Sequence, residues 1–492
     1  MNLLAIDQGT TSTRSLLFDA SGQLLASAQR EFSQSYPQPG WVEHDPQTIW
    51  SDVLSTAREV VARSHAQVAA IGIANQRETT VVWARGDGTP VYPAIVWQDR
   101  RTAAECERLR RDGAEALVCA RTGLLLDPYF SATKLAWILD HVAGARARAE
   151  RGELAFGTID SFLLWHLTGG KVHATDATNA SRTMLFDIHR QCWDGDLLRL
   201  FNIPEALLPE VYDNSFLYGV TAPGLFDHEL PVAGMAGDQH AALIGQACLD
   251  AGMAKATYGT GCFFLLNTGQ EALPPATGTL TTMAYRMDGR PTYAVEGSIF
   301  CAGAALKWLR DRFHLFTEVS RTGAMAAATG GNDGVYLVPA FTGLGAPYWD
   351  PDARGLICGL TLDSSPAHIV RAALESAAYQ TLDLLGAIAS GGGPPRALRV
   401  DGGMAGNEWF CQFLADIIAT PVERPAMLEA TAQGAAYLAG LTLGIFPDIA
   451  ALSAAWARGA RFEPRMERAE RERLTAGWRD AVQRAVRPRE SV

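Results

Sequence analysis

Two segments of the chain share the pattern of an apolar strand, a turn rich in glycine and threonine, and a second apolar strand. The first runs from Leu3 to Asp19 around the turn Asp7–Arg14. The second runs from Met253 to Asn267 around the turn Gly259–Gly261. A unit that recurs within one chain indicates structural halves of related design. The pattern therefore predicts two lobes built on a related plan.

The length of the chain also favours two lobes. A chain of 492 residues, with 48% hydrophobic and 19% charged residues, is too long for one core and has the composition of a globular enzyme. No linker rich in Ser or Pro interrupts it, so we expect a tight hinge near Gly245–Gly252 and a cleft between the lobes. The predicted lobes are residues 1–246 and residues 247–492.

Charge and cysteine content exclude several classes of protein. The net charge of −11 disfavours binding to nucleic acid or to anionic membranes, which needs a basic surface. No two of the eight cysteines have C-x-x-C spacing, so neither a zinc site nor a redox pair is indicated. The N-terminus lacks a signal-peptide pattern, and no apolar run is long enough for a membrane span. These features predict a cytoplasmic protein that is not inserted in a membrane.

The turn Asp7–Arg14 contains the side chains that a phosphate site needs. The chain has neither the P-loop motif nor G-x-G-x-x-G, so a bound nucleotide would need a different device. Gly9 permits a close approach of the backbone, and Arg14 can neutralise phosphate. Asp7 is placed to hold a metal ion through water, and three consecutive residues offer hydroxyl groups: Thr10, Thr11 and Ser12. The alternative interpretation is an ordinary solvated hairpin turn.

Two further segments carry polar side chains suited to a polyhydroxyl ligand. Adjacent Arg77 and Glu78, between two apolar strands, offer fixed donors and acceptors. Asp238 and Gln239 precede a helix of small residues, where an Asp is either an N-cap or a catalytic base. The carbon skeleton of such a ligand would need an apolar wall, and the candidates, each of which could also be a core residue, are Trp97, Tyr129 and Phe263.

Long stretches of the chain, read together, resemble the FGGY family of carbohydrate kinases from Leu4 to about Ala485. The stretches include A-I-D-Q-G-T-T-S-T-R, N-Q-R-E-T-T, D-P-Y-F-S-A-T-K, T-N-A-S-R-T-M-L-F, A-G-D-Q, T-Y-G-T-G-C-F and R-V-D-G-G. The resemblance implies an α/β chain with the actin-like fold, in which two ribonuclease-H-like lobes flank a central cleft for ATP and substrate. It implies that the N-terminal lobe binds polyol and phosphate and that the C-terminal lobe binds the nucleotide.

The resemblance also implies roles for individual residues. Around the polyol it places Arg77, Glu78, Trp97, Tyr129, Asp238, Gln239 and Phe263. On the nucleotide it places Thr10, Thr11, Ser12, Arg14, Thr260, Gly303, Lys307, Gly403 and Asn407. Asp7 and Asp238 are expected to approach Mg²⁺. The chain departs from the family's usual pattern at His240 and Lys307, where glutamine is common.

The activity implied by the resemblance is ATP-dependent phosphorylation of glycerol to sn-glycerol 3-phosphate, by in-line transfer with Asp238 as general base. The alternatives are a kinase for another polyol or sugar, such as erythritol, xylulose or gluconate, an actin-like ATP-binding regulator, and a family member with an inactive site. A homodimer or homotetramer is expected because the family often forms them.

Overall fold

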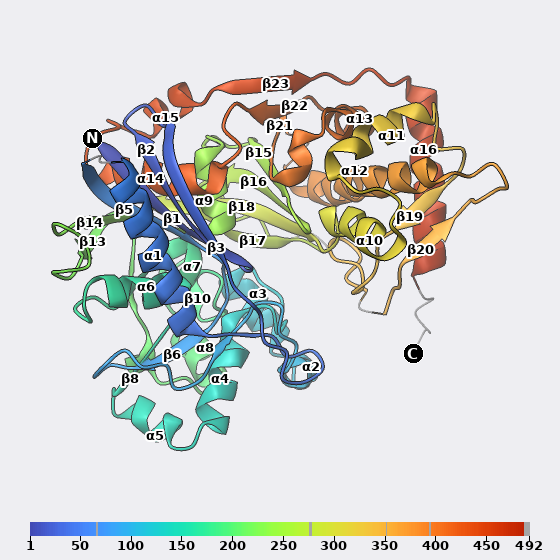
Figure 1. Ribbon diagram of the computed structural model, residues 1–492. Coiled ribbons are helices and arrows are strands. Elements are labelled where there is room, and N and C mark those ends of the chain that lie inside the picture. The colour runs from blue at the N-terminus through green and yellow to red at the C-terminus, as the bar shows by residue number, and fades with distance from the viewer. Residues whose placement is uncertain (65–66, 275–277, 351, 393–394, 487–492) are drawn as a thin grey trace.

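The computed structural model describes residues 1–64, 67–274, 278–350, 352–392 and 395–486. Residues 487–492, which end the predicted second lobe, lie outside the described residues. Two mixed β-sheets form the centre of the molecule (Figure 1). The first sheet has the order β13 (Ser215–Val220), β14 (Pro231–Gly237), β5 (Val68–Asn75), β1 (Asn2–Gln8), β2 (Ser12–Asp19) and β3 (Leu24–Glu31).

The second sheet repeats the central pairing of the first. Its order is β17 (Leu280–Met287), β18 (Arg290–Ile299), β16 (Cys262–Gly269), β15 (Ala254–Tyr258), β21 (Leu398–Asp401), β22 (Val422–Pro425) and β23 (Arg458–Phe462). β1 is antiparallel to β2 and parallel to β5, and β15 is likewise antiparallel to β16 and parallel to β21. The predicted pair of related lobes is thus confirmed, since the two recurring sequence segments are equivalent hairpins.

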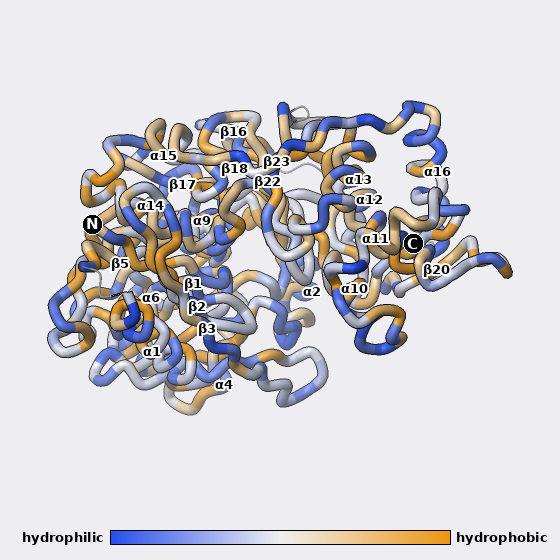
Figure 2. Tube along the Cα trace, turned by 45° about the horizontal axis from the view of Figure 1, so that its top comes forward, coloured by the Kyte–Doolittle hydropathy of each residue, from blue (hydrophilic) through white to orange (hydrophobic). Residues whose placement is uncertain are grey.

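Helices lie beside both sheets. α1 (Pro46–Ser64) begins after Asp45, whose carboxylate accepts from the amides of Gln47 and Thr48 at 3.1 and 3.3 Å, and it buries Ile49, Val53 and Val60. Beside the second sheet lie α10 (Gly303–Phe313), α11 (Thr322–Ala328), α12 (Pro366–Gly392), α13 (Glu408–Ile418) and α16 (Arg468–Ala485) (Figure 1). Hydrophilic residues recur along α16 (Figure 2). Leu474 and Trp478 belong to its apolar stripe and are buried.

Two helices rich in small residues lie between the sheets. α9 (Asp238–Gly245) follows β14, and α14 (Ala430–Thr442), from the C-terminal half, lies beside β1, β5 and α9 (Figure 1). A Cβ atom on Gly434 would lie 1.8 Å from the Ala241 carbonyl oxygen, and one on Gly72 would lie 2.0 Å from the Ala435 carbonyl oxygen. Because any side chain would clash there, the glycines allow α14 to pack closely against α9 and the first sheet. The predicted division of the chain at residues 246 and 247 remains a prediction.

A long insertion between β5 and β14 covers one end of the first sheet. It contains β6 (Val81–Ala84), β7 (Ala94–Ile95), α2 (Ala103–Arg111), α3 (Glu115–Thr122), α4 (Ser131–His141), α5 (Ala145–Glu150), β8 (Leu154–Gly157), α6 (Ile159–Leu167), β9 (Ala174–Asp176), α7 (Ala177–Ala180), β10 (Phe186–Asp187), β11 (Cys192–Trp193), α8 (Gly195–Leu200) and β12 (Glu210–Tyr212). The other short elements are β4 (Glu43–His44), β19 (Tyr336–Val338), β20 (Leu356–Cys358) and α15 (Ile449–Ala455). Across the described ranges, none of the helices combines the length and the apolar character that a bilayer span requires.

Candidate active site

The first hairpin carries a charged pair at its turn. Asp7, at the end of β1, lies opposite Arg14 on β2, and their side chains form an ion pair. Arg14 also donates from Nη1 to Glu429 Oε2 at 2.5 Å, just before α14. The adjacent Asp7 carboxylate is the main reason that the pKa of Arg14 is raised, so this side chain stays cationic. The Gly9 amide closes the turn on the Ser12 carbonyl at 2.9 Å.

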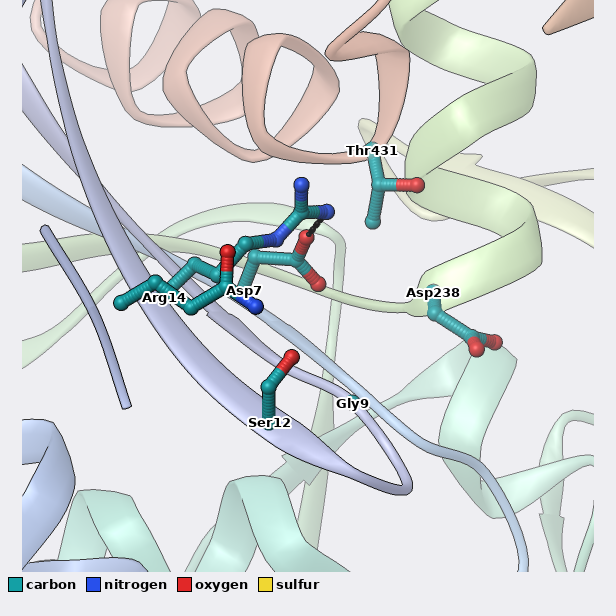
Figure 3. Close-up of a pocket in the computed structure, with 7 residues that line it drawn as sticks. Asp7, Gly9, Ser12, Arg14, Asp238 and Thr431 are labelled. Atoms are coloured by element: carbon teal, nitrogen blue, oxygen red, sulfur yellow. Dashed lines mark hydrogen bonds and ion pairs between the residues drawn. The ribbon is translucent and has the colours of Figure 1, made fainter. Parts of the chain in front are cut away.

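A cavity of about 230 Å³ opens between this hairpin and the start of α9. It is lined by Asp7, Gly9, Ser12, Arg14, Gln29, Asp238 and Thr431. Figure 3 shows Asp7 and Arg14 facing each other on the strands, with Asp238 on a helix at the other side of the cavity. The fold therefore brings Asp238 together with Asp7, Ser12 and Arg14 of the first hairpin, which lie far from it in the sequence.

Asp238 is the first residue of α9, and its carboxylate is not an N-cap. The N-cap is Gly237, and Asp238 Oδ1 accepts a hydrogen bond from the amide of Gln239 at 2.7 Å. Arg77 Nε lies 3.4 Å from the same oxygen, while 27% of the side chain remains exposed. Burial raises the pKa of Asp238 to about 6, although the positive charges of Arg77 and Lys255 oppose the rise. A carboxylate with a free oxygen and a pKa near neutrality can accept a proton from a ligand.

Beside Asp238 lies a buried network of two arginines and two glutamates. Arg77 Nη1 and Nη2 donate to the two oxygens of Glu296 on β18 at 2.6 and 3.0 Å. Arg182 Nε donates to Glu78 Oε1 at 2.6 Å, and its Nη2 donates to Glu296 Oε1 at 3.1 Å. Burial alone would raise the pKa of Glu296, but Arg182 and Arg77 outweigh it and lower this pKa to about 2.

Glu78 has an unusual backbone conformation, with φ of 60°. Such a conformation costs a non-glycine residue on the order of 1–3 kcal/mol and persists where the surroundings enforce it. Its carbonyl accepts from the hydroxyls of Ser131 at 3.0 Å and Thr80 at 3.1 Å. The strand end is thus held so that Arg77 and Glu78 both point into the polar network.

Three aromatic side chains lie against this network. The rings of Trp97 and Tyr129 meet edge to face with centroids 5.5 Å apart, and Trp97 meets Phe263 at 6.1 Å. The Arg77 guanidinium lies over Phe263 at 5.8 Å and donates to the Tyr129 hydroxyl at 3.4 Å. All seven residues that the sequence places around a polyol are therefore linked through Arg77, Trp97 or the start of α9. Trp97 Nε1 also donates to Thr10 Oγ1 at 2.9 Å, which connects the aromatic wall to the first hairpin.

The second hairpin meets glycines of two other segments. The Gly303 amide, at the start of α10, donates to the Gly259 carbonyl at 3.0 Å, and the Thr260 carbonyl accepts from Ala302 and Ala304. Gly402 has φ of 84°, and a Cβ atom there would lie 2.5 Å from the Tyr258 carbonyl oxygen. Close backbone approach thus gathers Thr260, Gly303 and Gly403 on this side of the cleft.

The remaining predicted site residues have different surroundings. Asn407 caps α13 by accepting from the Phe410 amide at 3.2 Å, and its Nδ2 donates to Thr322 Oγ1 at 3.3 Å. Lys307 is exposed on α10, and Thr11 is exposed at the tip of the first hairpin. His240 is fully buried, and within the described part of the chain neither of its ring nitrogens has a hydrogen-bond partner.

Several residues of the site escaped the sequence reasoning. They are Arg182, Lys255, Glu296, Glu429 and Thr431. Arg182 belongs to the stretch T-N-A-S-R-T-M-L-F, so its position was visible but its role was not. A glutamate inside the otherwise apolar and small run around Glu296 on β18 was the available signal for that residue.

Comparison with known proteins places this arrangement in a family. The model of the FGGY family of carbohydrate kinases, N-terminal domain, matches residues 2–245, and the model of its C-terminal domain matches residues 254–443. The chain belongs to the FGGY family of carbohydrate kinases, and its two lobes have the actin-like fold of that family.

Within the family the chain is similar to bacterial glycerol kinases. It is 60% identical to that of Ectopseudomonas mendocina over 486 residues, which cover 98% of each chain. It is 58% identical to that of Rhodospirillum centenum over 485 residues, which cover 98% of this chain and 97% of the relative. The crystal structure of Plasmodium falciparum glycerol kinase with ADP matches with a TM-score of 0.93 at 35% identity, covering 99% of this chain and 98% of that one. A xylulose kinase from Lactobacillus acidophilus shares the fold, with a TM-score of 0.88 at 21% identity.

Proposed function

We propose that the protein transfers the γ-phosphoryl group of ATP to a terminal hydroxyl of glycerol, giving sn-glycerol 3-phosphate and ADP. The observation that carries the proposal is the Asp238 carboxylate, which lines the cavity beside the first hairpin and whose Oδ2 accepts no hydrogen bond from the residues that the structure describes. The similarity to glycerol kinases at 58–60% identity supports glycerol as the acceptor.

The surroundings of Asp238 suit a small polyol. Buried Arg77 and Glu78 present charged polar atoms to hydroxyl groups, and Glu296 holds Arg77 in place through two hydrogen bonds. The rings of Trp97 and Phe263 give an apolar surface for a short carbon skeleton. Specificity for a polyol follows from this combination, since buried polar groups left without a partner would penalise an acceptor that lacks a hydroxyl.

The nucleotide would lie between the two hairpins. Arg14 and the hydroxyls of the first hairpin would contact the terminal phosphates, and the glycines around Thr260 and Gly403 would admit the rest of the nucleotide to the second sheet. The crystal structure of Plasmodium falciparum glycerol kinase with ADP, which has the same fold, supports this use of the cleft.

The cavity also fits a magnesium ion held mainly by water and phosphate. Asp7 and Asp238 both line it, and one or two carboxylates together with substrate phosphates are the usual protein contribution to a Mg²⁺ site. When bound there, Mg²⁺ would neutralise charge on the transferring phosphoryl group.

The reaction would proceed as one in-line displacement. Asp238 accepts the proton of the attacking hydroxyl as its oxygen bonds to the γ-phosphorus, and the bond from that phosphorus to the β,γ-bridging oxygen breaks to release ADP. Arg14 faces the phosphate side of the cavity and stabilises negative charge there. Closure of the lobes would exclude water that could otherwise hydrolyse ATP.

The test is ATP-dependent ADP release by the purified protein with glycerol, dihydroxyacetone, erythritol, xylulose, ribulose or gluconate. Strong turnover with glycerol and background rates with the larger sugars are expected. Asp238→Asn should abolish most of the glycerol-dependent rate, whereas Asp311→Asn, a matched change at an exposed ion pair on α10, should not. A larger sugar as the best substrate would overturn the glycerol assignment, and equal rates for Asp238→Asn and the parent would overturn the general base.

The net charge bears on the cellular setting. We infer a cytoplasmic enzyme that binds neither nucleic acid nor membranes, supported by the net charge of −11. A homodimer or homotetramer stays a prediction.

A further inference from the structure

Lys255 is a buried cation whose strongest contact is with a predicted substrate-binding residue. It lies on β15 in the second sheet, and its exposed fraction is 0%. Its Nζ donates to Gln239 Oε1 on α9 at 2.5 Å and to Thr257 Oγ1 at 2.9 Å. A buried ammonium group is costly unless its hydrogen bonds are made, so this lysine is held in one position.

The chemistry of this contact determines which way the Gln239 amide faces. A lysine ammonium has three donors and no acceptor, so the amide oxygen must face Lys255. The amide nitrogen Nε2 then points away, and it hydrogen-bonds no residue within the described ranges, while the residue keeps 6% exposure. In this orientation Gln239 can offer the cleft an N–H donor but not its oxygen.

We propose that Lys255 is a positioning residue that fixes Gln239 as a hydrogen-bond donor to one hydroxyl oxygen of the acceptor. The inference rests on the proposed function, and it adds a specificity determinant contributed by the second sheet. Lys255 does not touch the acceptor, and it acts through the orientation of the Gln239 amide.

The polar residues next to Lys255 lie on two neighbouring strands of the second sheet, in the direction of the nucleotide side. Thr257, which accepts from Lys255, lies opposite Asp401 at the end of β21 in the pairing of the two parallel strands. Gln246 Nε2 donates to Asp401 Oδ2 at 2.8 Å. Neighbouring polar residues therefore extend from Asp401, next to Gly402 and Gly403, through Thr257 and Lys255 to the acceptor side of the cleft.

Burial lowers the pKa of Lys255, and two nearby carboxylates work against this lowering. The charged groups that act on Lys255 are Asp401 on β21, Asp238 on α9 and Arg77 after β5. The two carboxylates stabilise the cation and Arg77 opposes it, and neither carboxylate forms a direct ion pair with Lys255 within the described residues. On α9, the group that Lys255 contacts directly is therefore the neutral amide of Gln239.

Another buried lysine shows what a purely structural arrangement looks like. Lys134 on α4 donates to the backbone carbonyls of Pro128, Tyr129 and Phe130 at 2.9, 2.6 and 2.9 Å. All three of its donors are used by backbone, so it fixes a turn. Lys255 instead uses one donor on the side chain of Gln239, which is why we assign it a role in specificity.

The test compares glycerol with propane-1,2-diol and propane-1,3-diol in the parent enzyme, Lys255→Met and Lys255→Arg. Each diol lacks one hydroxyl, and the ratio of kcat/KM for glycerol to that for the diol measures the contribution of that hydroxyl. In Lys255→Met this ratio should fall by about tenfold for one of the diols, the effect of one hydrogen bond with a fixed donor. Lys255→Arg, which keeps a donor, should recover part of the ratio.

A double substitution separates positioning from loss of stability. In a Gln239→Ala background, Lys255→Met should no longer change the diol ratio, because the residue through which it acts is gone. If Lys255→Met does not fold, Thr257→Val, which removes one anchor, should lower the same ratio by a smaller factor.

Unchanged ratios for both diols in these variants, whatever happens to thermal stability, would overturn the positioning role. The parent enzyme separates this outcome from failure of the proposed function. If the parent does not phosphorylate glycerol, the proposed function fails, and with it the basis of this inference. If the parent is active and the ratios do not move, only the role of Lys255 fails.

Discussion

The first hairpin, β1–β2, and the second hairpin, β15–β16, occupy equivalent places in their sheets but carry different side chains. β1 carries Asp7 just before its last residue, opposite Arg14, whereas β15 ends in buried Tyr258, opposite Cys262. The parallel strand next to each hairpin differs in the same way. β5 leads into the charged pair Arg77–Glu78, whereas β21 leads into a pair of glycines.

The difference shows how one topology can serve two tasks. In both sheets the hairpin turn and the end of the neighbouring parallel strand reach the cleft, so both positions are available to a ligand. The first sheet uses them for charged side chains, which suit acceptor chemistry and phosphate. The second sheet uses them for glycine, which lets a ligand approach the backbone closely.

The largest expected effect is on the acceptor side. Asp238→Asn should lower kcat by about 10²- to 10⁴-fold, the usual contribution of a general base, because the amide cannot take the hydroxyl proton. The affinity for ADP, measured by calorimetry, should change little, because the second sheet is untouched. A comparable loss of ADP affinity would show that the two sides do not divide the work as their side chains suggest.

Glu296 connects the two sides, since it lies on the second sheet and pairs with arginines of the first lobe. Glu296→Gln leaves buried Arg77 and Arg182 short of a countercharge and should reduce the free energy of unfolding by about 3–5 kcal/mol. Urea unfolding measures this loss. Glu153→Gln, at an exposed pair with Arg151, is the control and should change the free energy of unfolding very little.

The contribution of Glu296 should depend on pH with a defined sign. Its pKa is about 2 in the folded protein, below the ordinary value of 4.5, so the carboxylate stabilises the fold above pH 4.5. That stabilisation should be lost progressively as the pH falls from about 4.5 toward 2. The difference in unfolding free energy between the parent and Glu296→Gln should therefore shrink over this range. A difference that stays constant down to pH 2 would contradict the ion-pair assignment.

On the nucleotide side, Gly402→Ala should lower the free energy of unfolding by about 1–3 kcal/mol. Alanine is strained at φ of 84°, and its Cβ would meet the Tyr258 carbonyl. The KM for ATP should rise with little change in the KM for glycerol. Gly144→Ala, at φ of 72° with open space around it, isolates the backbone strain and should cost less. Equal losses of unfolding free energy in the two variants would mean that the close approach of Gly402 to Tyr258 does not contribute to stability.

The smallest effect is expected at Lys307. Its side chain is exposed on α10, so Lys307→Ala should change the KM for ATP less than about threefold, as for most surface substitutions. Steady-state kinetics with varied ATP provide the measurement. A much larger increase would establish the nucleotide contact that the family resemblance implies for this residue.

Local sequence patterns were sufficient for many elements of the fold. The two hairpin segments, Leu3–Asp19 and Met253–Asn267, and the helix of small residues at Asp238 were predicted from local residue patterns, and the structure confirms them. The residues that form each of these signals lie close together in the sequence, so the signals can be interpreted without knowledge of the rest of the fold. Asp238 shows the limit of such signals, because its place before a helix of small residues allowed both an N-cap and a catalytic base.

The sequence by itself determined the two hairpins and, through its long motifs, the family. Only the tertiary structure decided that Glu296 pairs with Arg77, that α14 crosses to the first sheet and that Lys255 reaches Gln239. The physical reason is that hydrogen bonds and ion pairs between side chains depend on distances across the fold. Arg77 and Glu296 are 219 positions apart, so no local or periodic pattern in the sequence indicates their contact.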